Sequence, residues 1–411
     1  MVTTAATEDL LLPPGTRLLH IGPSKTGTTS VQSAFHVNRE ALAAHGVHYA
    51  GEQEHSLYAV RLGTGMPWHV EREFLPHRHP WRLLVKEIRD AGDARVVISS
   101  EAFADTPEPQ IRRVVDELGG DRVHVVVTLR ALGRIVPSVW QQYVKAGIIY
   151  SFDDWLHAQL EDPKTAITPS FRYLHRHDDL IRRWLAVVGA DRMTVVAVDD
   201  ADHGMVLRTF ERFVGLPSGL LVARSDRMNR SFTYPEIEVV RAFNRMYKAA
   251  AGQELYHRGL RLGAFRTIAV REPPPDEPRI QLPAWAAGPI ATRQDEIVAA
   301  IASSGVRVLG ALERLAQPPP SAPPDAPPVD PRATPELAAS FMAGMLYGTG
   351  LLPDDGRGGL PGEVAGPEVW GVPAVRLIRA LGIRAAKRAL RVTRKLPKRV
   401  RGSVTSAVRR G

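Results

Sequence analysis

The feature that most constrains the fold is a glycine-rich turn near the amino terminus. The turn reads Gly22-Pro-Ser-Lys-Thr-Gly-Thr-Thr29 and follows the short apolar run at 17–22. A helix is expected from about Thr28 to Ala44, so this stretch predicts a strand, a tight loop and a helix N-terminus. Backbone N–H groups and the helix dipole at such a junction bind anions. We therefore expect a phosphate-binding loop here.

The position of Lys25 separates this loop from the nucleoside-triphosphate pattern G-x-x-x-x-G-K-[ST]. Gly22 and Gly27 have the spacing of that pattern and Thr29 stands at its hydroxyl position, but Thr28 replaces its lysine. Lys25 lies earlier, inside the loop, where it would face one phosphate and its bridging oxygen. The candidate phosphate-binding residues are Ser24, Lys25, Thr26, Gly27, Thr28, Thr29 and Ser30.

Strand-like and helix-like segments alternate along the first half of the chain. Short β-branched runs at 94–99, 122–129 and 193–198 follow the first strand. The intervening helical segments are expected at 80–91, 107–118, 131–146 and 173–188. This alternation predicts an α/β fold of the P-loop-like kind, with three layers and a central parallel sheet. From 204 to 316 the pattern is mainly helical.

A second polar signature follows the third of these strands. Arg130 stands at the end of that strand, and Ser138 comes eight residues later in the expected helix. The carboxyl ends of parallel strands face the crevice where open α/β sheets bind ligands. An arginine with a serine about two helical turns away is a suitable receptor for a second phosphate group.

The two signatures together resemble the sulfotransferases that use 3′-phosphoadenosine 5′-phosphosulfate (PAPS), in their bacterial, carbohydrate-type branch. The residues that carry the resemblance are His20-Ile-Gly-Pro-Ser-Lys-Thr-Gly-Thr-Thr-Ser-Val-Gln32 and Arg130…Ser138, and it covers about 16–250, including Asn229-Arg-Ser231. The family's first motif binds the 5′-phosphosulfate and its second binds the 3′-phosphate. The resemblance implies PAPS as the donor substrate and no metal requirement.

The reaction that the resemblance implies moves a sulfonyl group to a hydroxyl or amine of a carbohydrate, glycolipid or small-molecule acceptor. Lys25 would stabilise the departing phosphate oxygen. Glu101 follows the strand at 94–99 and is predicted to take the acceptor's proton, as a glutamate does in the carbohydrate-type enzymes. His55, His20 and other histidines are rivals for that role, although His20 is expected to be a buried, hydrogen-bonded core residue.

The residues that contact the acceptor are harder to assign from sequence. His55, Gln142 and Lys145 are the candidates, and loops at roughly 50–80 and 145–175 are expected to line the acceptor pocket. A nucleotide-dependent kinase or NTPase is the alternative enzyme class. A non-catalytic nucleotide-binding protein associated with a membrane is the alternative outside enzymes.

Proline and basic residues divide the remainder of the chain. We expect a sulfotransferase domain at 1–316, a proline-rich extended linker at 317–333 and a basic amphipathic extension at 334–411. Residues 371–411 hold 13 Lys or Arg and no acidic residue, which leaves a net charge of −4 for 1–370. The basic segment at 373–401 suits an anionic membrane surface, or is a solubilising tail. Specific nucleic-acid binding is not expected.

The absence of cysteine excludes disulfides and thiolate metal sites. Residues 1–14 lack the features of a signal peptide, and no stretch has the apolar length of a membrane span. A cytoplasmic location is therefore expected, with peripheral attachment to the inner face of the membrane as a variant. The sequence leaves the oligomeric state open.

Overall fold

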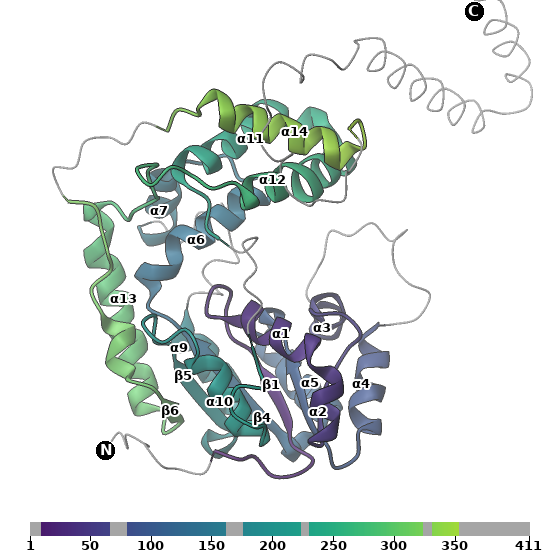
Figure 1. Ribbon diagram of the computed structural model, residues 1–411. Coiled ribbons are helices and arrows are strands. Elements are labelled where there is room, and N and C mark those ends of the chain that lie inside the picture. Colours follow the sequence, from purple (N-terminus) through teal and green to yellow (C-terminus); the bar gives the residue numbers. More distant parts are fainter. Residues whose placement is uncertain (1–9, 66–79, 162–175, 223–229, 324–330, 353–411) are drawn as a thin grey trace, which may run out of the picture. The chain divides into compact units, whose positions relative to one another are not determined.

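The computed structural model describes residues 10–65, 80–161, 176–222, 230–323 and 331–352 (Figure 1). The chain divides into two compact units. The first unit comprises Met1–Asp226 with Pro278–Asp330, and the second comprises Arg227–Glu277 with Pro331–Gly411. The domain boundaries predicted at 316 and 333 stay a prediction. The basic tail predicted at 373–401 lies outside the described residues.

The first unit is built on one parallel sheet in the order β2-β3-β1-β4-β5-β6. The strands are β1 (Arg17–His20), β2 (Val47–Tyr49), β3 (Arg95–Ser99), β4 (Val123–Leu129), β5 (Met193–Ala197) and β6 (Arg307–Leu309). The predicted α/β fold with a central parallel sheet is confirmed. The two strands that sequence did not predict, β2 and β6, are three residues long and form the edges of the sheet.

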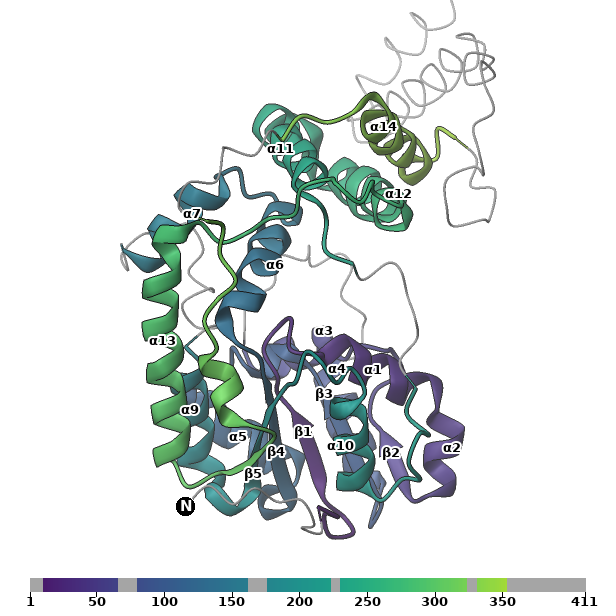
Figure 2. The same cartoon turned by 60° about the vertical axis from the view of Figure 1, so that its left-hand side comes forward.

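Helices cover both faces of the sheet and complete the three layers (Figures 1 and 2). The helices of the first unit are α1 (Thr28–Val37), α2 (Arg39–Ala44), α3 (Leu57–Gly63), α4 (Pro80–Asp90), α5 (Glu108–Leu118), α6 (Leu132–Lys145), α7 (Phe152–Leu160), α9 (His177–Val188), α10 (Met205–Val214) and α13 (Ala284–Ser303). Val31 and Phe35 of α1 share a buried cluster with Phe210 of α10 and with Leu18 and Val126 of the sheet. On the other face, α9 contacts β4 and packs beside α5.

The single helix expected at 28–44 is divided at Asn38. The Asn38 side chain donates a hydrogen bond to the carbonyl oxygen of Ala34 at 2.8 Å, which satisfies one of the last carbonyls of α1. A second helix, α2, then begins at Arg39. An asparagine that bonds to nearby backbone groups competes with helix propagation, which explains the break.

The described residues of the second unit, 230–277 and 331–352, are mainly helical. The helices are α11 (Tyr234–Leu255), the π-helical segment η6 (Tyr256–Ala264), α12 (Phe265–Val270) and α14 (Pro335–Thr349). Segment η6 packs against α14 through glycines: a Cβ atom on Gly263 would lie 2.1 Å from the carbonyl oxygen of Gly344. Only hydrogen side chains allow two helix backbones to approach so closely.

A buried ion network ties the start of α11 to the end of α12. Arg230 and Arg271 both donate to Glu236, with N–O distances of 2.7 and 2.8 Å, and Arg271 also bonds to Glu277. Arg230 donates further to the carbonyl oxygen of Ala269 at 3.0 Å. The arginine of the sequence Asn229-Arg-Ser231 therefore has a packing role in this unit.

The described part of the proline-rich segment packs on the first unit. Pro319 is buried, and a Cβ on Gly133 would lie 2.2 Å from its side chain. The Ala322 N–H donates to the carbonyl oxygen of Leu282 at 2.8 Å. Residues 317–323 are thus held against α6 and the approach to α13. Within the described ranges, none of the helices combines the length and apolar character that a membrane span requires.

The close approach of η6 and α14 leads to a stability prediction. Gly263→Ala would place a methyl group against the Gly344 backbone, and relieving that overlap should cost about 1–3 kcal/mol. Gly288→Ala on α13 is the matched control, because nothing lies within 4 Å of its added Cβ. In urea titrations, the unfolding midpoint of Gly263→Ala should lie below that of the wild-type protein, and that of Gly288→Ala should not. Equal midpoints for both variants would contradict the packing described here.

Candidate functional site

The loop between β1 and α1 lies where the chain reverses its order across the sheet. Strand β1 has β3 on one side and β4 on the other, so strands that follow it in sequence lie to both its left and right. Ligands of open parallel sheets bind outside the carboxyl ends of the strands at this kind of switch point. The loop residues 22–27 leave the carboxyl end of β1 there.

The backbone of the loop adopts a conformation that suits an anion. Lys25 has a φ of 73°, the sole positive value for a non-glycine residue in the described part of the chain, and Gly27 follows at 95°. Helix α1 starts at Thr28 with no side-chain cap and no acidic residue in its first turn. The first N–H groups of a helix have no partner within it, so Thr28, Thr29 and Ser30 can present these donors to a bound anion.

A chain of buried side chains supports the loop from beneath. His20 Nδ1 lies 2.8 Å from Ser99 Oγ, and His20 Nε2 lies 3.0 Å from Thr128 Oγ1. Thr128 Oγ1 is in turn 2.9 Å from Thr26 Oγ1, which donates to the carbonyl oxygen of Pro23 at 2.7 Å. The prediction of His20 as a buried, hydrogen-bonded residue is confirmed.

Donor and acceptor roles along this chain follow from its carbonyl end. Since the Thr26 hydroxyl hydrogen goes to the Pro23 carbonyl, Thr26 must accept from Thr128, and Thr128 must accept from His20 Nε2–H. His20 Nδ1 then accepts from Ser99. A neutral imidazole meets these roles, and burial indeed lowers the pKa of His20 to about 3.

Residue 22 must be a glycine because these hydrogen-bonded side chains leave no room for a Cβ atom. A Cβ there would lie 2.2 Å from Thr128 Oγ1 and 2.8 Å from His20 Nε2. Its backbone conformation is ordinary, since its φ is not positive. The first glycine of the motif is thus required for space, whereas Gly27 is required for its φ.

Glu101 and His55, two of the predicted site residues, are joined in the structure by Gln32. Gln32 Nε2 donates to Glu101 Oε2 at 3.1 Å and to the Ser99 carbonyl oxygen at 3.3 Å. Its Oε1 atom lies 2.7 Å from His55 Nδ1. Burial lowers the pKa of Lys25, and the charge of Glu101 acts in the opposite direction. Gln32 lies on α1 one turn after Thr28, a spacing that could have indicated it from sequence.

The loop that carries His55 is anchored at several backbone positions. Glu87 of α4 accepts from the Gly51 N–H at 3.0 Å and from His48 Nε2 at 2.8 Å. Arg39 donates to the Tyr49 carbonyl oxygen at 2.5 Å and also to that of Gly51. The Tyr49 hydroxyl donates to the Glu54 carbonyl oxygen at 2.9 Å. These contacts, and not the local sequence pattern, determine where His55 lies.

Arg130, predicted to bind a second phosphate, has an acidic partner. Its Nε atom lies 2.5 Å from Asp200 Oδ1, and Arg134 Nε lies 3.7 Å from Asp200 Oδ2. Asp200 follows β5, which neighbours β4 in the sheet. Sequence reasoning missed Asp200, because its proximity to Arg130 depends on strand pairing between segments 70 residues apart.

The remaining predicted site residues lie on one side of α6. Ser138, Gln142 and Lys145 are spaced by four and three residues, and such positions share a helix face. Ser138 and Lys145 are half-buried and Gln142 is exposed. The acceptor-side segments at 66–79 and 162–175 lie outside the described residues, so the structure does not complete this part of the predicted site.

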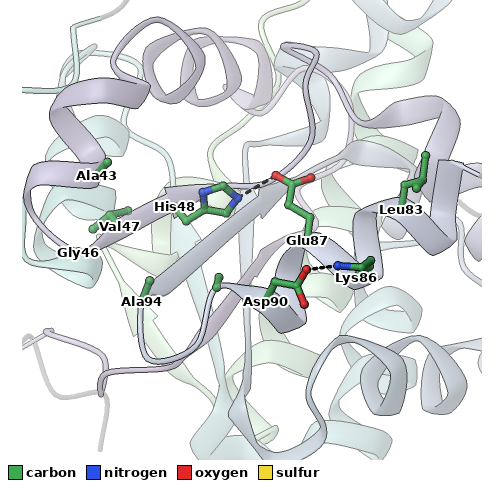
Figure 3. A pocket seen from close by; sticks show the side chains of 10 residues that line it. Ala43, Gly46, Val47, His48, Leu83, Lys86, Glu87, Asp90 and Ala94 are labelled. Carbon is green, nitrogen blue, oxygen red and sulfur yellow. Dashed lines mark hydrogen bonds and ion pairs between the residues drawn. The ribbon is translucent and has the colours of Figure 1, made fainter.

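A pocket of about 580 Å³ lies away from the loop, among α2, β2 and α4 (Figure 3). Figure 3 shows His48 directed toward Glu87 and Lys86 toward Asp90 on its wall. None of the predicted site residues lines it. In the described ranges no cluster of three His, Asp or Glu side chains is arranged to hold a metal ion.

Searches against protein-family models and against curated proteins find no match to this chain.

The buried histidine beneath the loop predicts a specific loss of stability in acid. Its pKa is about 3 when folded and about 6.5 when unfolded, so the unfolded chain binds the extra proton between these values. The contribution of neutral His20 to the free energy of unfolding is fully present above pH 6.5. It falls by roughly 1.4 kcal/mol per pH unit as the pH decreases toward 3. The unfolding free energy of His20→Gln, measured by urea titration between pH 6 and pH 4.5, should therefore fall less steeply with decreasing pH than that of the wild-type protein. The difference should be about 1.4 kcal/mol per pH unit.

His203→Gln serves as the control for that measurement, because His203 is exposed. This variant should keep the pH dependence of the wild-type unfolding free energy. An unchanged slope in His20→Gln would mean that His20 is not held neutral in the folded protein.

Proposed function

We propose that this chain is a sulfotransferase that moves a sulfonyl group from PAPS to a hydroxyl or amine of a carbohydrate, glycolipid or small-molecule acceptor. The observation that carries the proposal is a lysine at the positive-φ position of a loop that leads into a helix N-terminus, together with a carboxylate whose charge acts on that lysine. Lys25 occupies the strained position of the loop, and Glu101 influences its pKa. A loop lysine in this position suits a single phosphate and its bridging oxygen.

In the proposed reaction the acceptor oxygen or nitrogen attacks sulfur while the bond between sulfur and the phosphate oxygen breaks. The electron pair of that bond remains on the phosphate oxygen, where the Lys25 ammonium stabilises it. The N–H groups of Thr28 to Ser30 and their hydroxyls hold the 5′-phosphate. Glu101 takes the proton that the acceptor releases. His55, which shares the Gln32 amide with Glu101, is the candidate contact to the acceptor.

The 3′-phosphate is assigned to Arg130 and Ser138. Arg130 is paired with Asp200 at the end of β5, so binding of a phosphate there exchanges one anionic partner for another. Arginine bonds to phosphate and to carboxylate with the same planar set of donors, so the exchange requires little rearrangement of the guanidinium. This pair supports recognition of a nucleotide with a phosphate that ATP lacks.

Two substitutions test the catalytic assignment. Lys25→Met and Glu101→Gln should each lower the rate of sulfonyl transfer from PAPS about 10²- to 10³-fold, because each removes charge stabilisation or proton transfer in the transition state. Glu101→Gln should retain adenosine 3′,5′-bisphosphate binding in calorimetry. Lys86→Met is the matched control, because Lys86 pairs with Asp90 on the exposed face of α4. This variant should keep full activity. Full turnover in Glu101→Gln would mean that another group is the base.

Ligand-dependent thermal stability tests the donor. Adenosine 3′,5′-bisphosphate should raise the melting temperature of the wild-type protein more than adenosine 5′-phosphate does, and Arg130→Ala should remove that difference. The shift with adenosine 5′-phosphate should remain in the variant and provides the internal control. Stronger stabilisation by ATP with magnesium than by the bisphosphate would instead favour a kinase or NTPase.

A further inference from the structure

We propose that Gln32 is a positioning residue that gives His55 an unprotonated Nε2 atom and holds Glu101 at the opposite end of its amide, so that the site selects an acceptor group carrying a hydrogen. The catalytic part of this inference rests on the proposed function. The hydrogen-bonding part concerns the protein alone and can be tested without a reaction.

The orientation of the Gln32 amide follows from the chemistry of its neighbours. One end of the side chain meets the Ser99 carbonyl oxygen and a Glu101 carboxylate oxygen, at 3.3 and 3.1 Å. Both of these atoms accept hydrogen bonds, so the NH₂ group must lie at this end. The amide oxygen therefore lies at the other end, which faces His55.

The amide oxygen in turn determines the tautomer of His55. A carbonyl oxygen can only accept, so the contact of 2.7 Å requires a hydrogen on His55 Nδ1. In a neutral imidazole the second nitrogen then carries a lone pair. His55 Nε2 is consequently a hydrogen-bond acceptor. A hydroxyl or an amine can donate to it, whereas a group without a hydrogen cannot.

Packing holds Gln32 in the position that these bonds need. The side chain is 1% exposed, in the middle of α1, between helix neighbours Val31 and Ser33 that are also buried. The Ser99 carbonyl belongs to the last residue of β3, so the amide is anchored to the sheet as well as to the helix. A buried amide with all these partners has little rotational freedom.

Glu101 interacts electrostatically with three further groups. Its charge opposes the effect of burial on the pKa of Lys25, and it adds to the effect of burial on the pKa of Tyr49 and of Asp105. Burial and that charge raise the pKa of Asp105 to about 6, against the opposing charges of Arg61 and Arg183. The Gln32 N–H group adds a donor to Glu101 without adding charge.

The positions of two candidate acceptor contacts depend on the same amide. An acceptor hydroxyl has one hydrogen and donates it either to His55 Nε2 or to Glu101. Loss of that amide would free both groups at once. Misplacement of reacting groups by about 1 Å is enough to lower rates roughly 10²-fold.

The test compares Gln32→Met with Gln294→Met. Gln294 is likewise 1% exposed and uses its amide to bond to backbone groups, but it lies on α13 away from the loop. Nitrogen-15 NMR of the ligand-free, full-length protein reports which nitrogen of His55 carries hydrogen, with His55→Asn identifying the signal. We expect Nδ1–H in the wild-type protein and in Gln294→Met, and a loss of that preference in Gln32→Met.

Rates of sulfonyl transfer from PAPS are then measured for the same variants. Gln32→Met should lower kcat roughly 10²-fold with little change in bisphosphate affinity, and Gln294→Met should keep kcat. A wild-type His55 with hydrogen on Nε2 would overturn the inference whatever the activity. Retained kcat in Gln32→Met would overturn its catalytic part. A wild-type protein without transfer activity but with Nδ1–H would instead refute the proposed function alone.

Discussion

The structure of the candidate site depends on one buried chain of hydrogen bonds. It runs from Ser99 of β3 through His20 of β1 and Thr128 of β4 to Thr26 and the Pro23 carbonyl in the loop. These side chains are at most 1% exposed, so each must find its partner within the protein. Because the roles of donor and acceptor pass consistently along the chain, removing one member would leave a buried polar group unsatisfied, at a cost of about 1–3 kcal/mol.

These hydrogen bonds also explain how the loop tolerates the positive φ of Lys25. A non-glycine residue at positive φ costs of the order of 1–3 kcal/mol and persists only where its surroundings require it. Thr26, next to Lys25, is tied both to its own loop and to β4. Lys25 is thereby held in a strained conformation within the loop that precedes α1. Burial lowers its pKa, and the charge of Glu101 opposes that effect.

Several features of the fold were predictable from local sequence, and the reasons are physical. The four inner strands are short buried segments, and three of them are rich in β-branched residues. Their predicted limits agree with the structure to within two residues at either end. The edge strands β2 and β6 are too short to show a period. The break at Asn38 arises from one side-chain bond within a stretch that otherwise has helical composition. Pro319 packs against Gly133, a contact that composition cannot reveal in a proline-rich segment.

The sequence by itself determined the chemistry that is available: a lysine inside a glycine-rich loop before a helix, a carboxylate after one strand and an arginine after another. Motif spacing and strand ends are local properties, so residues such as Lys25, Glu101 and Arg130 could be named without coordinates. Only the tertiary structure decided that Gln32 joins His55 to Glu101 and that Asp200 pairs with Arg130. Those contacts arise from parallel strand pairing and from the packing of α1 on the sheet, which bring together residues that are distant in the sequence.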